Sequence, residues 1–199
     1  MTSGDLASLL SQILRIPLST IALYGRHLRA ADLVSVKGYG RGAAQMTARD
    51  AAVYLVALCI DHERGGDFAR EVKRVLALPL SDTVVTVADF GDDLLFSKAR
   101  TAGDAIAALF TDALAPRFVE HMRSREEMFT VHFDAEGASV SVSLTPKTID
   151  GVFYGGGWTY QRGKYDDRKR RNIERLTVLH SAVFHDIAKA LGVIPPPPT

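Results

Sequence analysis

The spacing of hydrophobic residues changes along this chain of 199 residues, and the change limits the fold classes open to it. Segment 5–14 repeats its apolar residues at the helical period. Segments 129–133 and 138–144 instead alternate apolar and polar residues, as half-buried strands do, and the acids and glycine of 134–137 can turn one into the other. Helices at one end of a chain and an antiparallel hairpin toward the other are typical of the α+β class. We therefore predict an α+β fold.

Capping residues, prolines and β-rich composition indicate further elements between and after these segments. Asp67 is suited to begin a helix, Pro79 to follow its end, and Gly192 to end the last helix. The predicted helices are 67–76, 101–123 with a break near Pro116, and 179–191, and the further candidate strands are 82–87, 151–155 and 173–178.

Breaks in composition divide the chain into three predicted parts. Gly65-Gly66 is the best hinge, so residues 1–65 form one predicted domain and residues 66–194 a second, built of helices around a small antiparallel sheet. Residues 195–199 form a stiff, proline-rich tail.

Two amphipathic helices are predicted before residue 33, separated by Ile16-Pro17, because proline lacks an amide donor and restricts the residue before it. The second helix runs from about Ser19 to Asp32. A helical wheel assigns the two faces of this helix. The predicted buried face holds Leu18, Ile21, Gly25 and Leu28, and the predicted exposed face holds Ser19, Leu23, Arg26, His27 and Ala30.

The next segment has the pattern of a hairpin that leads into a helix. Residues 33–37 alternate like a short strand, 38–42 are glycine-rich, and 43–46 can return as a second strand. Thr47 followed by Asp50 resembles a capping box, with aspartate in the usual glutamate position, and predicts a helix from there to about residue 61.

This order of elements resembles a winged helix-turn-helix DNA-binding domain over about 50 residues: helix, short turn, second helix ending at Leu33-Val34, glycine-rich wing, new helix. The wing Gly38-Tyr39-Gly40-Arg41 and the helix start Thr47–Asp50 are also similar to the MerR-type branch of that superfamily. The glycine that the family usually has before the Leu-Val pair is Asp32 here, a residue that tolerates left-handed backbone.

The resemblance implies a transcriptional regulator that binds double-stranded DNA. A helix fits the major groove when its exposed face offers hydrogen-bonding groups to base edges, and basic residues on a wing can neutralise phosphates. The predicted DNA-binding residues are Ser19, Thr20, Leu23, Arg26, His27, Arg29, Lys37, Tyr39, Arg41 and Arg49.

Such a domain alone covers little DNA, so we expect a homodimer that reads two half-sites. The helix 179–191 is a candidate dimer face, although an apolar stripe of that width is also what a core helix carries. The second domain is then expected to hold the dimer, a small-molecule effector or a partner protein.

Charge is distributed unevenly, although the formal net charge is only +1. Residues 1–50 carry six basic groups against three acidic ones, 162–175 carry seven against three, and 51–161 carry ten against sixteen. Two basic segments around an acidic middle favour a polyanionic partner, and a solvated charged face is the alternative. The second segment is either another nucleic-acid site or a mobile charged loop. Its candidate residues are Lys164, Arg168, Lys169, Arg170 and Arg171.

The sequence gives little support for catalysis, and we predict no metal and no cofactor. The six histidines show no ligand spacing, Gly155–Gly157 lacks the Lys-Ser/Thr of a phosphate-binding loop, and Cys59 is expected to be a buried hydrophobe. Two other interpretations stay open: an accessory DNA-binding protein of a phage or mobile element (packaging, partition or recombination), and an enzyme with a site around His132, Tyr154 and Trp158.

No apolar run approaches the roughly 18 residues of a membrane span, and the N-terminus lacks a basic region followed by an apolar one. We expect no membrane partner and a cytoplasmic protein.

Overall fold

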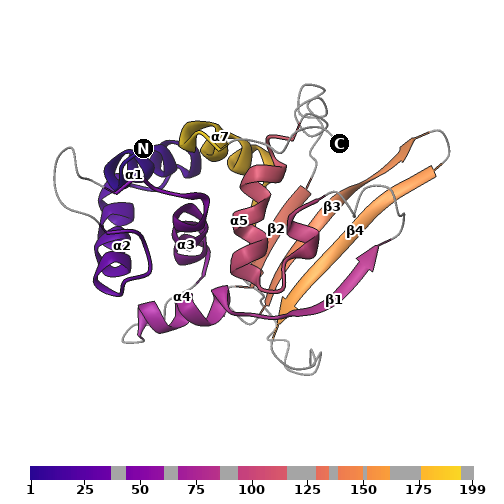
Figure 1. Cartoon of the computed structure of the whole chain (residues 1–199), viewed down its shortest axis with the longest axis horizontal. Helices are drawn as coiled ribbons and strands as arrows, with labels where there is room; N and C mark the ends of the chain where they lie inside the picture. Colours follow the sequence, from indigo (N-terminus) through magenta and orange to yellow (C-terminus); the bar gives the residue numbers. More distant parts are fainter. Residues whose placement is uncertain are drawn as a thin grey trace.

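A computed structural model describes residues 1–36, 44–60, 67–85, 94–115, 129–134, 139–149, 152–161 and 176–193. These residues form helices and a small antiparallel sheet, so the α+β prediction is confirmed (Figure 1). The helices are α1 (Ser3–Leu14), α2 (Leu18–Ala30), α3 (Ala48–Cys59), α4 (Phe68–Leu76), the short 3-10 helix η2 (Phe96–Lys98), α5 (Ala102–Asp112) and α7 (Ser181–Leu191). The strands are β1 (Leu80–Val85), β2 (Phe129–Asp134), β3 (Ser139–Ile149), β4 (Val152–Gln161) and β5 (Leu176–His180).

The predicted helix starts at Thr47 and Asp67 are confirmed, and α1, α3 and α4 each have a local side-chain cap. Thr2 and Asp5 form a capping box at α1, Thr47 and Asp50 form one at α3, and Asp67 accepts from the amide of Arg70 at α4. Asp32, just after α2, has a φ of 54°, the left-handed geometry expected at this position.

Helix α3 lies at the centre of the helical part of the molecule. It packs against α2, α4, α5 and α7, and Figure 1 shows it between α2 and α5. Nine of its twelve residues are buried. One hydrophobic cluster includes residues from both sides of the predicted boundary at residue 65, from Leu6 to Ala188. The division into two domains stays a prediction, and Gly65-Gly66 lies outside the described residues.

The sheet has the strand order β1-β4-β3-β2-β5, with every neighbouring pair antiparallel. The predicted hairpin is confirmed: Phe129 pairs with Leu144, and Phe133 with Val140. Burial alternates along β2, as the sequence pattern predicts. The Phe184 ring of α7 lies 5.3 Å from that of Phe129 and 5.2 Å from that of Phe110 on α5. Helices α5 and α7 therefore cover one face of the sheet.

The structure corrects the predicted hairpin after α2. Residues 33–36 and 44–47 are described, and neither segment is a strand. Their backbone donors have other partners: the amides of Ser35 and Thr47 donate to the buried carboxylate of Asp50, and the amide of Met46 donates to the carbonyl of Met1. In segments 33–36 and 44–47, these hydrogen bonds are made in place of the strand-to-strand hydrogen bonds of a hairpin.

Of the two interpretations of the last helix, a dimer face or a core helix, the structure supports the core helix and moves its start. Leu179 belongs to β5, the helix begins at Ser181, and Phe184, Ile187 and Ala188 are fully buried within the chain. The stripe is apolar because α7 fills the space between α5 and the sheet. In the part of the chain that the structure describes, no helix is long and apolar enough to cross a membrane.

Candidate nucleic-acid interface

Helix α2 buries one face and exposes the other. Ile21 and Leu28 are 0% exposed, and Gly25 is buried beside them. The predicted outer residues Ser19, Leu23, Arg26, His27 and Ala30 are all exposed. One assignment is wrong: Leu18 is 47% exposed, because it stands at the start of the helix beside the exposed Pro17 and Ser19.

The first flank of α2 rests on α4 through aromatic rings, a contact that the sequence analysis missed. The ring of Tyr24 stacks on that of Phe68 at 5.2 Å with an interplanar angle of 1°. The exposed His27 also reaches this ring, at 5.9 Å and tilted by 56°. The two residues are three apart in α2 and so lie on one side of the helix.

The opposite flank is fixed by polar groups from α1 and α3. Nη1 of Arg29 donates to Oγ of Ser3 at 2.7 Å, and this oxygen lies 3.2 Å from Oη of Tyr54, which is 1% exposed. The Tyr54 hydroxyl lies so close to α2 that a Cβ atom built on Gly25 would be 2.4 Å from it. Glycine is therefore needed here for close helix packing. Arg29, a predicted DNA-binding residue, is half-buried and holds α2 to α1.

Asp50 holds the two segments that flank residues 37–43. Its carboxylate, 4% exposed, accepts from the amides of Ser35 and Thr47 at 2.8 Å each and from both of their hydroxyl groups. Four donors meet the hydrogen-bonding needs of a buried carboxylate. Lys37, Tyr39 and Arg41 lie outside the described residues.

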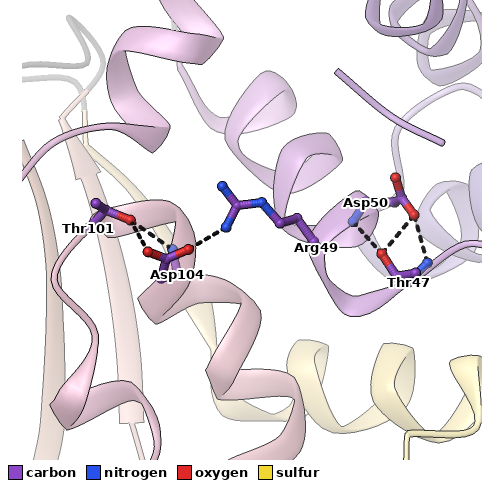
Figure 2. A network of polar contacts seen from close by, with 5 residues as sticks. All are labelled: Thr47, Arg49, Asp50, Thr101 and Asp104. Carbon is purple, nitrogen blue, oxygen red and sulfur yellow. Dashed lines mark hydrogen bonds and ion pairs between the residues drawn. The ribbon is translucent and has the colours of Figure 1, made fainter. Parts of the chain in front are cut away.

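Arg49 is on the exposed side of α3, and its guanidinium forms an ion pair with Asp104 of α5 (Figure 2). The Thr101 hydroxyl donates to the same carboxylate, and this hydrogen bond, together with Arg49, keeps the pKa of Asp104 below its ordinary value. The Arg49 side chain is 60% exposed.

The remaining candidate residues are those of the second basic segment and those around His132. The second basic segment, with Lys164, Arg168, Lys169, Arg170 and Arg171, lies outside the described residues. His132 on β2 forms a hydrogen bond of 2.9 Å with the hydroxyl of Thr130. In the sheet, His132 pairs with Ser141 of β3, and Ser141 pairs with Thr159 of β4. The β4 residue in register with His132 is therefore Thr159, and Trp158 pairs with Val142 instead.

Cys59 is buried, and this burial raises the pKa of its thiol to about 12, so it is a neutral packing group. Over the described ranges, no three His, Cys, Asp or Glu side chains are grouped so as to hold a metal ion.

Comparison of the chain with protein-family models, curated proteins and solved structures finds no match.

Proposed function

We propose that this protein binds duplex DNA in a sequence-dependent way as a transcriptional regulator, through the exposed face of α2. One observation carries the proposal: α2 presents Ser19, Arg26 and His27 to solvent while its other sides are fixed by α1, α3 and α4. A helix held in this way can enter a major groove without losing its orientation, and arginine can read guanine through paired donors.

Basic residues that follow α2 in the sequence are expected to make the phosphate contacts. Lys37 and Arg41 follow Val36 in sequence, and Arg49 lies in the first turn of α3. Each phosphate that such a residue neutralises adds affinity that salt removes. The order of helices in the winged helix-turn-helix resemblance supports the same assignment, with Thr20, Leu23 and Arg29 along the helix and Tyr39 in the basic segment that follows it. A homodimer would present two such helices to two half-sites.

The test is to select preferred sites from random duplexes with the intact protein and with Arg26→Ala. Loss of one good arginine–base pair costs about 1–3 kcal/mol of discrimination, so Arg26→Ala is expected to weaken sequence preference more than bulk affinity. Arg41→Ala is expected to do the reverse, with all duplexes weakened alike and the salt slope reduced by about one unit.

Arg70→Ala, on the exposed side of α4, is the matched control and should change neither property. If the intact protein and Arg26→Ala select the same sites with equal strength, α2 is not the reader. If the intact protein binds long DNA and selects no site, the accessory role in a phage or mobile element replaces transcriptional control.

A further inference from the structure

A cavity of about 380 Å³ opens beside α2, on the flank that faces α1 and α3. Its apolar wall includes Ala7, Ala22, Val36 and Met46, and its polar groups include Ser3, Tyr54 and Arg29. Small-molecule sites have this character: mostly apolar walls with a few polar groups that orient the ligand, in volumes of roughly 300–1,000 Å³.

Arg29 gives this cavity its charge, since it is the one ionisable side chain among the described lining residues apart from the tyrosine. The guanidinium is half-buried, and in the part of the chain that the structure describes its hydrogen-bond partner is the neutral hydroxyl of Ser3. Among the described residues, the carboxylates near the cavity are already engaged: Asp5 caps α1 and Asp50 accepts from Ser35 and Thr47.

An arginine has five N–H donors, and among the described residues one donor of Arg29 is used, by Ser3. Its remaining donors can form the two parallel hydrogen bonds that a carboxylate accepts.

We propose that this cavity binds a small organic carboxylate with an apolar body, whose carboxylate is held by Arg29 and whose body lies against Ala22, Val36 and Met46. Charge complementarity selects an anion, and the apolar wall selects against a bare phosphate. A regulatory consequence rests on the proposed function: the ligand contacts α2 as well as Val36 and Ala44, and neutralising Arg29 should weaken duplex binding.

The probe is phenylacetate, with phenylacetamide as a neutral ligand of the same shape. Titration of the full chain, followed by amide chemical shifts, should show saturable binding of phenylacetate with shifts centred on residues 2–7, 22–29, 35–36 and 44–46. Phenylacetamide should bind about tenfold more weakly, as expected for the loss of one charge-assisted interaction. Arg29→Gln should remove this difference, and Arg70→Gln, on α4, should preserve it.

A second variant keeps the test decisive if Arg29→Gln does not fold. Ala22→Leu retains the charge of Arg29 and fills part of the cavity from an exposed helix position, so it should weaken both ligands. The proposal is overturned if phenylacetate does not saturate, if the two ligands bind equally well to the intact protein, or if Ala22→Leu binds both as well as the intact protein does.

A duplex titration separates the site from the proposed function. Weaker duplex binding in the presence of phenylacetate supports both. Unchanged duplex binding overturns the regulatory consequence while the cavity site stands. Absence of duplex binding under all conditions, with phenylacetate still bound, overturns the proposed function alone.

Discussion

Helices α2 and α3 are neighbours of nearly equal length, with thirteen and twelve residues, yet they relate to solvent in opposite ways. α3 buries nine residues and α2 buries three. The cause is position: α3 is covered by α2, α4, α5 and α7, whereas one face of α2 has no described element over it. We infer that α3 contributes more than α2 to the stability of the fold, and that the outer face of α2 is exposed to solvent.

The largest expected effect is on the free energy of unfolding, when the same leucine-to-alanine substitution is made separately in α3 and in α2. Leu55 on α3 is 0% exposed and Leu23 on α2 is 43% exposed. Leu55→Ala should lower the free energy of unfolding by about 2–5 kcal/mol, because it leaves a cavity in the core. Leu23→Ala should change it by less than about 0.5 kcal/mol. Urea denaturation measures both values, and a similar loss for the two variants would contradict the assignment of stability to α3.

The contact between the two helices should give an intermediate effect. In Gly25→Ala the new Cβ would meet Oη of Tyr54 at 2.4 Å, so one helix has to shift, at a cost of about 1–3 kcal/mol that outweighs the roughly 1 kcal/mol gained in helix propensity.

Removing the Tyr54 hydroxyl should relieve this clash. With Tyr54→Phe the nearest remaining ring atom would be 3.3 Å from the new Cβ, so Gly25→Ala should cost much less in that background. The four proteins of this double-mutant cycle are compared by urea denaturation. An equal cost in both backgrounds would show that the close approach of α2 to α3 does not depend on this hydroxyl.

The parts of the fold that the sequence predicted correctly depend on neighbouring residues. Thr47 and Asp50 are three residues apart, so their capping box can be seen in the sequence, and the two faces of α2 follow from its periodicity. The β2–β3 hairpin follows from alternation and a short turn.

The parts that could not be predicted depend on residues far apart in sequence. Asp50 also accepts from Ser35, fifteen residues away, and this bond gives segment 33–36 a conformation other than the strand that its alternation predicts. The apolar stripe of α7 looks the same whether it meets another chain or the core, and only the positions of α5 and the sheet decide. The cavity beside α2 likewise requires α1, α2, Tyr54 of α3 and the segments 35–36 and 44–46 to meet, which no local pattern indicates.

The smallest expected effect concerns the exposed end of α3, where Arg49 forms its ion pair with Asp104 (Figure 2). Exposed pairs contribute about 0.2–1 kcal/mol, so Asp104→Asn should lower the free energy of unfolding by that amount at pH 7. The pKa of Asp104 is lowered in the folded state by Thr101 and Arg49, so its contribution is present above the ordinary pKa near 4 and is lost as pH falls through the lowered value. Denaturation from pH 7 downward should therefore bring Asp104→Asn and the intact protein together at acid pH. Asp186→Asn, on the exposed side of α7, serves as the control. A difference that persists unchanged at the lowest pH would mean that Asp104 stabilises the junction of α3 and α5 by something other than its charge.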